Sequence, residues 1–252
     1  MPTALITGGT AGIGYEFAQQ LAAQRYDLIL VARDVERLTS VSEALAAEHG
    51  VSVETITADL TAPAELAVVE KRLADASRPV DLLVNNAGYG LKERFLTNSI
   101  EAENGMLDVL VVAVLRLTHA ALGPMTARRS GGIINVSSVA GFLPRGTYSA
   151  AKAWVNSFSE WAHYEYAPDG VVITALCPGF TKTEFHSRMN VSRSSAPSFM
   201  WLDVERLVRE GLADHAKGRA FSIPSKRYKA IVRLSKLVPN AVLQKAQSLG
   251  RK

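Results

Sequence analysis

Short apolar runs alternate with longer amphipathic segments along most of this chain. The run Asp27–Val31 is apolar at consecutive positions after its first residue, which is typical of a strand buried on both faces of a sheet. Strands that alternate with helices predict an α/β protein whose mostly parallel sheet is covered by helices on both faces. Strands are expected at Thr3–Thr7, Asp27–Val31, Val51–Thr57, Val80–Asn85, Gly132–Ser137 and Val171–Leu176. Helices are expected at Gly12–Gln24, Val35–Glu48, Pro63–Ser77, Ile100–Met125, Ser149–Ala167 and Leu202–His215.

The composition is that of a globular protein rather than a disordered one, since 48% of the 252 residues are hydrophobic and 21% are charged. No internal repeat or linker interrupts the pattern, so a single domain is expected over residues 1–252. The lone cysteine, Cys177, excludes an intrachain disulfide. The N-terminus does not resemble a signal peptide and no segment resembles a membrane span, so a cytoplasmic location is expected.

The formal net charge is +4, and the excess lies mostly in the tail, residues 226–252, which has no acidic residue. The tail lacks interleaved aromatic residues and recognition motifs, so nucleic acid is not an expected partner. A basic amphipathic segment can lie on an anionic membrane surface. It can equally pack on the body of the protein or on a partner subunit with its charges outward, and the pattern leaves both interpretations open.

A glycine-rich segment follows the first strand and opens the first helix, with the sequence Thr7-Gly8-Gly9-Thr10-Ala11-Gly12-Ile13-Gly14. Glycines in such a turn let the backbone approach a pyrophosphate, and the helix N-terminus supplies N–H donors and a favourable dipole. The segment therefore predicts a dinucleotide site on a doubly wound, Rossmann-type domain. The expected contacts are Gly8, Thr10, Gly12, Ile13 and Gly14.

The end of the second strand bears on the choice between NAD and NADP. Folds that bind NAD usually place a carboxylate there for the ribose 2′-hydroxyl. This chain has Arg33, which suits a 2′-phosphate, followed by Asp34, which suits a helix N-cap. NADP is therefore the expected cofactor, and the alternative is that Arg33 is a solvated loop charge.

Tyr148 and Lys152 are four residues apart, which places both side chains on one face of a helix. An ammonium group there can favour the tyrosinate and lower the pKa of the phenol from its usual value of about 10. A phenol with a lowered pKa can serve as a general acid or base near neutral pH. Two serines, Ser137 and Ser138, precede this pair at the end of a predicted strand.

Together these segments resemble the short-chain dehydrogenase/reductase family over roughly residues 1 to 185. The motifs that carry the resemblance are Thr7–Gly14, Asp59-Leu60, Asn85–Gly88, Asn135–Ser138, Tyr148–Lys152 and Pro178-Gly179. The resemblance implies that Ser138 polarises the substrate carbonyl, that Tyr148 transfers its proton, and that Lys152 binds the nicotinamide ribose and lowers the pKa of the phenol. It also implies that Asp59, with Leu60 beside it, contacts the adenine region. The remaining implied cofactor contacts are Asn86, Ala87, Gly88, Pro178, Gly179 and Thr183.

Two departures from the family pattern stand out. Leu110 occupies the position of an asparagine that, in the family, helps hold a water connecting the lysine to bulk solvent. The connection Val139–Thr147 is shorter than usual, and its Phe142, Leu143 and Pro144 could wall the substrate site or simply pack the loop. Leucine has no donor or acceptor, so a cofactor-binding regulatory or scaffold protein with weak catalysis is the alternative to an active enzyme.

The expected function is an NADP(H)-dependent interconversion of a carbonyl and an alcohol on a hydrophobic 3-oxoacyl, steroid or long-chain substrate. The substrate loop, about residues 184–203, contains Phe185, Met189, Phe199, Met200 and Trp201, which could cover such a substrate or anchor the loop. The family implies a homo-oligomer formed through two long helices, and Trp161 and His163 on the second of them are expected at a subunit contact or in the core. The histidines have no metal-ligand spacing, so no metal site is expected.

Overall fold

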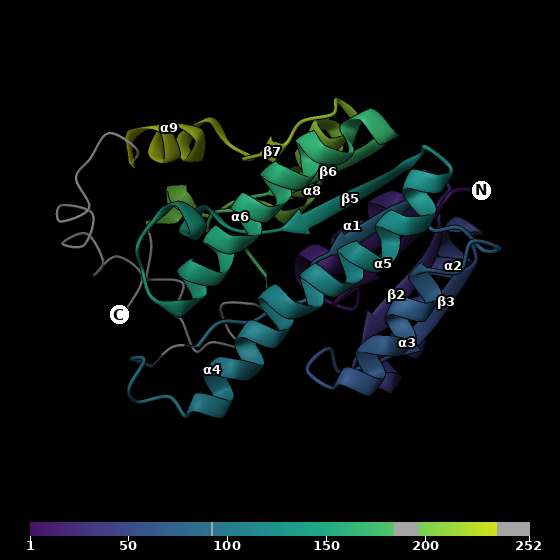
Figure 1. Ribbon diagram of the computed structural model, residues 1–252, viewed down its shortest axis with the longest axis horizontal. Helices are drawn as coiled ribbons and strands as arrows, with labels where there is room; N and C mark the ends of the chain where they lie inside the picture. The colour runs from purple at the N-terminus through teal and green to yellow at the C-terminus, as the bar shows by residue number, and fades with distance from the viewer. Residues whose placement is uncertain (92, 184–196, 236–252) are drawn as a thin grey trace.

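The computed structural model describes residues 1–91, 93–183 and 197–235. These residues form a seven-stranded sheet in the order β3-β2-β1-β4-β5-β6-β7, in which every strand pair is parallel. The predicted doubly wound α/β fold is therefore confirmed (Figure 1). The strands are β1 Thr3–Thr7, β2 Asp27–Ala32, β3 Val53–Thr57, β4 Leu82–Asn85, β5 Gly131–Val136, β6 Val171–Leu176 and β7 Phe221–Ser222.

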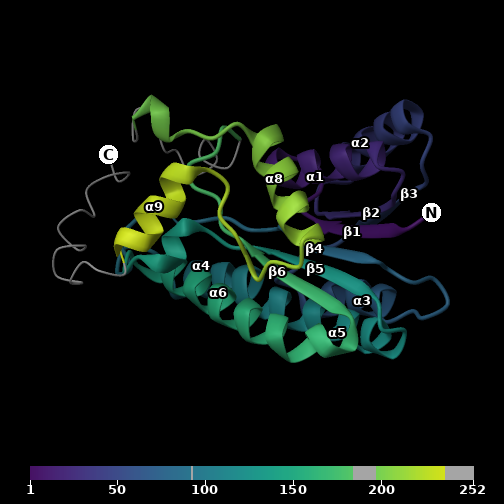
Figure 2. The ribbon, with the colours of Figure 1, turned by 90° about the horizontal axis from the view of Figure 1, so that it is seen from above.

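Helices cover both faces of the sheet, as Figure 2 shows. One face carries α1 (Gly12–Ala23), α2 (Val35–His49) and α8 (Val204–Ala216). The other carries α3 (Pro63–Leu73), α4 (Ile100–Leu107), α5 (Ala113–Ala127) and α6 (Thr147–Tyr166). The helix α9 (Lys226–Ser235) lies at the edge of the molecule.

Alternate strand residues point to opposite faces, and each face has its own core. Leu5 and Leu83 belong to the core under α3 and α5, whereas their neighbours Ile6 and Val84 belong to the core under α1 and α8. This double burial explains why the strands are apolar at consecutive positions.

The long helix predicted at residues 100–125 is interrupted. A π-helical segment, Asp108–Val112, separates α4 from α5. The continuous stretch from Ile100 to Ala127 contains an 18-residue window with a mean hydropathy of 1.7. By length and composition it could cross a membrane, so the expectation that no segment resembles a membrane span is not met on those two criteria. Half of its apolar window is buried in the protein, and the core helix of a soluble protein has the same character.

Several short elements were not predicted, and three of them lie close to the site. β7 has two residues, too few to show a periodic pattern, and it pairs with Ala175 and Leu176 at the end of β6. A 3₁₀ turn at Val139–Phe142 fills the short connection after β5, and α9 occupies the first part of the tail. Residues 184–196 of the predicted substrate loop and residues 236–252 of the tail lie outside the described residues.

The topology places the site. The chain runs outward from β1 through β2 to β3 on one side and continues from β4 to β7 on the other. In such a sheet the crevice outside the carboxyl ends of the two central strands is where ligands bind. The glycine-rich turn follows β1 and the segment Asn85–Gly88 begins at the end of β4, so both motifs border this crevice.

Candidate active site

A cavity of about 1350 Å³ lies at the carboxyl ends of the strands and is lined by residues from the glycine-rich turn to α9. Almost every residue predicted from the sequence to bind cofactor or substrate is in its wall. These residues are Gly8, Thr10, Gly12, Ile13, Arg33, Asp59, Leu60, Asn86, Ala87, Gly88, Ser138, Tyr148, Lys152, Pro178, Gly179 and Thr183.

Gly14 is the exception, because it does not line the cavity and lies beneath the turn. A Cβ atom on Gly14 would sit 2.2 Å from the carbonyl oxygen of Gly8 and 2.4 Å from Nδ2 of Asn86. This glycine allows α1 to pack closely under the turn, and its predicted contact with the cofactor stays a prediction. Gly8 and Gly12 have φ angles of +66° and +55°, which side-chain-bearing residues rarely adopt, so they shape the turn itself.

The turn is tied to the end of β4 by hydrogen bonds. The Thr7 hydroxyl accepts bonds from the backbone N–H groups of Asn86 and Ala87, at 2.9 and 3.0 Å. The Asn86 side chain donates to the Thr7 carbonyl at 2.9 Å. Asn86 thus holds the cradle in shape, and Gly8 and Ala87 form its exposed wall. The small residues, the free approach to the backbone and the N-terminus of α1 fit a dinucleotide pyrophosphate.

Beyond the cradle, the cavity is lined by two arginines and two aspartates, which are Arg33, Arg37, Asp34 and Asp59. Arg33 is 71% exposed and its Nη1 lies 3.6 Å from a carboxylate oxygen of Asp59. Hydrogen bonds from Thr61 and the charge of Arg33 outweigh partial burial and lower the pKa of Asp59. The Asp34 carboxylate accepts the Arg37 N–H at 3.0 Å and caps α2, as the sequence suggested.

Arg37 is a functional candidate that sequence reasoning missed. It lies in the first turn of α2, and its residue lines the cavity together with Arg33. The sequence contained a signal for this residue. Arg37 follows Arg33 by four residues and the helix cap Asp34 by three, and a side chain at that position of a first helical turn faces back toward the end of β2.

Ser138, Tyr148 and Lys152 meet at the opposite end of the cavity. Ser138 follows β5 and its hydroxyl is hydrogen-bonded to the Tyr148 phenol. The Lys152 ammonium donates to the Val136 carbonyl at 2.7 Å and lies 5.9 Å from the centroid of the Tyr148 ring. Ser137 instead donates to the Lys152 carbonyl at 3.0 Å, so it anchors α6. This arrangement agrees with the choice of Ser138 over Ser137.

The pKa values of this group differ from the expectation. Burial raises the pKa of Tyr148 to about 12, opposed in part by the Ser138 hydrogen bond, so the prediction that Lys152 lowers it is not met in this structure. The physical reason is that the ammonium is directed at the Val136 carbonyl, while the phenol has lost its hydration. Burial also lowers the pKa of Lys152 to about 8.

Leu110 lies in the π-helical segment and is 1% exposed. Its Cδ2 atom would be 2.7 Å from a Cβ on Gly88, and it packs with Met106, Ala151 and Tyr148. The aliphatic side chain therefore fills the space between the cofactor cradle and the helix that carries Tyr148. π-Helical turns occur often at functional sites, and two residues of this one, Val109 and Leu110, line the cavity.

The remaining wall is mostly apolar, and Tyr228 of α9 closes it. The Tyr228 ring lies against Gly179, and its hydroxyl accepts the Phe180 N–H at 3.0 Å and donates to the Met200 carbonyl at 2.8 Å. The sequence analysis did not single out Tyr228, because nothing in the local pattern shows that the tail returns to the site. Ile231, on the same helix, also lines the cavity.

The structure also locates the remaining candidates from the sequence, which are the residues of the short connection after β5 and two residues of α6. Leu143 lines the cavity, whereas Phe142 packs on Phe221 with ring centroids 6.0 Å apart. His163 bonds the Ile173 carbonyl with Nδ1, and Trp161 is 53% exposed. Within the described residues, no three His, Cys, Asp or Glu side chains are grouped so as to hold a metal ion.

Comparisons with known proteins agree with this geometry. Residues 2–193 match the family described as short chain dehydrogenase. A short-chain dehydrogenase from Sphingobium yanoikuyae, solved with NADPH, is 34% identical, with a TM-score of 0.87 over 98% of this chain and 96% of that one. A bulky-bulky ketone specific alcohol dehydrogenase from Comamonas testosteroni is 30% identical, with a TM-score of 0.81 over 94% and 92% of the two chains. A very-long-chain 3-oxoacyl-CoA reductase of Danio rerio is 34% identical over 72% of this chain and 58% of its own length.

Proposed function

The chain belongs to the short-chain dehydrogenase family, and from that premise we propose that it interconverts a carbonyl and an alcohol with NADP(H), on a hydrophobic substrate. The observation that carries the proposal is the convergence of Ser138, Tyr148 and Lys152 at one end of a cavity whose other end is a glycine-rich dinucleotide cradle. Hydride chemistry needs both parts within one enclosed space.

The cradle and the end of the cavity beyond it are the parts that would hold the cofactor. The turn Gly8–Gly12 would bind the pyrophosphate, and Asn86, Ala87 and Gly88 would border the cofactor. Arg33 and Arg37 supply two cations for a 2′-phosphate, while Asp34 is engaged as a helix cap. The most similar fold named above was solved with NADPH, which supports the same choice.

The catalytic roles follow from protonation states. When bound, the nicotinamide supplies or accepts the hydride. The Ser138 hydroxyl lies where it can hydrogen-bond the substrate oxygen, and Tyr148 gives that oxygen its proton during reduction. A phenol with a pKa raised to about 12 is protonated near neutral pH, so Tyr148 holds the proton that reduction needs, but it is a weaker acid than an ordinary phenol. The role proposed for Lys152 is to stabilise the phenolate that forms, which requires its ammonium to turn from the Val136 carbonyl toward Tyr148.

The lining of the substrate end supports a hydrophobic substrate. Leu143, Met200 and Ile231 form this part of the wall together with the aromatic ring of Tyr228. Two of the related proteins are named for very-long-chain 3-oxoacyl-CoA and for bulky ketones, and both names describe large carbonyl compounds. A large hydrophobic ketone or 3-oxoacyl thioester is the proposed class.

Turnover of NADPH with a panel of carbonyl compounds tests the function, with Tyr148→Phe as the diagnostic variant. The variant keeps the ring and its packing but has no transferable proton, so we expect kcat to fall by about 10² or more while NADPH binding stays near that of the wild type. Equal turnover by the wild type and Tyr148→Phe would contradict the assigned role.

The second candidate is a cofactor-binding regulatory or scaffold protein, and the buried Leu110 is the observation that favours it. A titration with NADPH, followed by turnover with the carbonyl panel, separates the two candidates. Tight NADPH binding without reduction of any carbonyl in the panel would favour the regulatory protein.

A further inference from the structure

The helix α9 has a buried face and an exposed face of unusual composition. Tyr228 and Val232 are 3% and 5% exposed and hold the helix on the body. One turn apart on the outer side, Ile231 and Leu234 are 38% and 60% exposed. Among them stand the exposed cations Lys226, Arg227 and Arg233, and no residue of the helix is acidic. We call these five outward residues the α9 face.

The α9 face is extended by Phe199, which is 60% exposed. Arg227 donates to the Phe199 carbonyl at 2.5 Å, and its guanidinium carbon lies 5.6 Å from the centroid of the Phe199 ring. Arg227, Ile231 and Leu234 are spaced by four and three residues, so they form one row along the helix. The surface therefore holds two aliphatic side chains, Ile231 and Leu234, in line with Arg227 and beside the cations Lys226 and Arg233.

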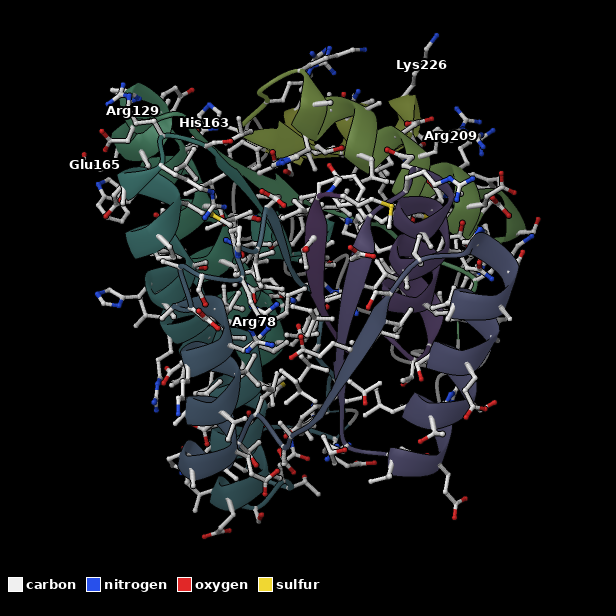
Figure 3. The ribbon with its side chains drawn as sticks, turned by 90° about the vertical axis from the view of Figure 1, so that its right-hand side faces the viewer. Arg78, Arg129, His163, Glu165, Arg209 and Lys226 are labelled. Atoms are coloured by element: carbon white, nitrogen blue, oxygen red, sulfur yellow. The ribbon has the colours of Figure 1, made fainter. Side chains whose placement is uncertain are left out.

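The helix is held firmly where it is. The Tyr228 hydroxyl bonds both Phe180 and Met200, and the N–H of Ser225, just before the helix, bonds the Glu210 carboxylate at 3.3 Å. Lys229 is the one cation of α9 whose charge acts on Glu210, so it is not part of the α9 face. The α9 face is thus carried by a helix that is packed on the body of the protein. This helix lies at the edge of the molecule in Figure 2, and the Lys226 side chain extends away from the body in Figure 3.

We propose that the α9 face docks on an anionic lipid bilayer. Aliphatic and aromatic side chains surrounded by Lys and Arg match the boundary between acyl chains and negative headgroups. A nucleic acid backbone would use the cations but not the two aliphatic side chains. Ile231 belongs to the α9 face and also lines the cavity, so the apolar wall of the active site continues to the docking surface. A hydrophobic substrate could then enter from the bilayer.

Sedimentation of the full-length protein with vesicles tests the proposal without depending on the proposed enzymatic function, since it measures binding alone. The probes are vesicles of phosphatidylcholine and vesicles that also contain phosphatidylserine. We expect binding to the phosphatidylserine vesicles that weakens as salt is raised, and little binding to phosphatidylcholine alone.

Two pairs of variants locate the surface. Lys226→Glu with Arg233→Glu should lower the partition coefficient about tenfold or more, whereas the same change at two exposed lysines elsewhere, Lys71 and Lys217, should have a smaller effect. Leu234→Ser should lower it about threefold, and Val68→Ser, at an exposed site on α3, should not. Circular dichroism and thermal unfolding verify that each variant is folded.

Three results would overturn the proposal. The first is wild-type protein that does not sediment with the anionic vesicles at low salt. The second is equal binding by the wild type and the Lys226/Arg233 double variant. The third is a loss of binding in the charge variants but not in Leu234→Ser, together with competition by duplex DNA, which would assign the surface to nucleic acid.

Discussion

Arg33 is the residue on which the cofactor choice depends. Its guanidinium is 71% exposed at the end of the cavity, where Asp59 is its only neighbouring carboxylate among the ion pairs of the described residues. In Arg33→Asp, we expect the KM for NADPH to rise about 10- to 100-fold, because a charge-assisted contact with the 2′-phosphate is replaced by repulsion. The KM for NADH should fall or stay constant. Arg25→Asp, a change of the same charge on the protein surface, is the control, and unchanged NADPH kinetics in Arg33→Asp would contradict the assignment.

We expect Lys152 to be essential for turnover although its buried charge lowers the free energy of unfolding. Burial lowers its pKa from 10.5 to about 8, so below that pH the folded protein carries a desolvated charge. The unfolded chain binds more protons between these two values, and the free energy of unfolding therefore rises with pH across that window. The shift corresponds to roughly 3 kcal/mol at pH 7, less about 1 kcal/mol for the hydrogen bond to Val136.

Lys152→Met should therefore raise the free energy of unfolding by about 2 kcal/mol at pH 7 and abolish turnover. Denaturant titrations of both proteins from pH 7 to pH 10 measure the difference, which should shrink as the wild-type lysine loses its charge. A variant that is less stable than the wild type at pH 7 would show that the ammonium is better solvated than its burial implies.

Most site residues could be assigned from the sequence because each sits in a local motif. The glycines and the pair Tyr148 and Lys152 stand out by their spacing, whereas the role of Ser138 was implied by the resemblance to the family. Gly14 was grouped with the glycines that line the cavity because a glycine under a turn and a glycine facing a cavity look the same in sequence. The pKa of Tyr148 could not be predicted, since it depends on burial and on the aim of the Lys152 ammonium, which a spacing of four residues does not fix.

At the scale of elements, the segment Asp108–Val112 combines a π-helical turn with the loss of the family asparagine. Leu110 is buried against Gly88 and close to Tyr148, so a polar side chain there would face the cavity. We expect Leu110→Asn to raise kcat about tenfold, by giving the proton path of Lys152 a donor and acceptor. The buried amide should lower the free energy of unfolding by about 2 kcal/mol.

Leu110→Met keeps the volume and apolar character of the position, so it should leave kcat unchanged and serves as the control. Steady-state kinetics of both variants separate a chemical effect from a packing effect. A lower kcat in Leu110→Asn would mean that protons reach Lys152 through other groups.

Helices and strands whose apolar residues recur with a clear period could be predicted from the sequence, and elements without such a period could not. β1 and β6 match their predicted bounds, and α1, α2 and α3 begin at the predicted residues. The π-helical turn was missed because its residues, Asp-Val-Leu-Val-Val, continue the helical pattern on both sides. β7 was missed because two residues have no period, and it forms only because the edge of β6 is available for pairing.

At the scale of the whole molecule, the site could be assembled from the sequence because of one topological fact. The carboxyl ends of parallel strands meet at one edge, so motifs that follow β1, β2, β4, β5 and β6 must converge there. No such topological rule predicts that α9 packs at the same edge of the sheet. Tyr228 reaches Gly179 through a tertiary contact between segments about fifty residues apart, which only the folded structure displays.

The outer faces of α5 and α6 bear on how copies of the chain associate. Figure 1 shows the two helices side by side on one face of the sheet. Leu115 on α5 is 43% exposed, and Trp161 and Tyr164 on α6 are 53% and 67% exposed. Trp154, Phe158 and Trp161 form an aromatic row, with centroids 4.8 and 6.0 Å apart. Exposed apolar patches of this kind mark association surfaces, so we expect a homo-oligomer built on these helices.

Trp161→Glu should break that association, because a charge at the centre of an apolar interface is desolvated without a partner. Light scattering coupled to gel filtration should give a multiple of 27.2 kDa for the wild type and about 27.2 kDa for the variant at micromolar concentration. Val68→Glu places the same charge on α3, where the side chain is 55% exposed, and should leave the mass unchanged. If Trp161→Glu keeps the wild-type mass, the copies associate through another face, and the exposed α9 face is then the next surface to mutate.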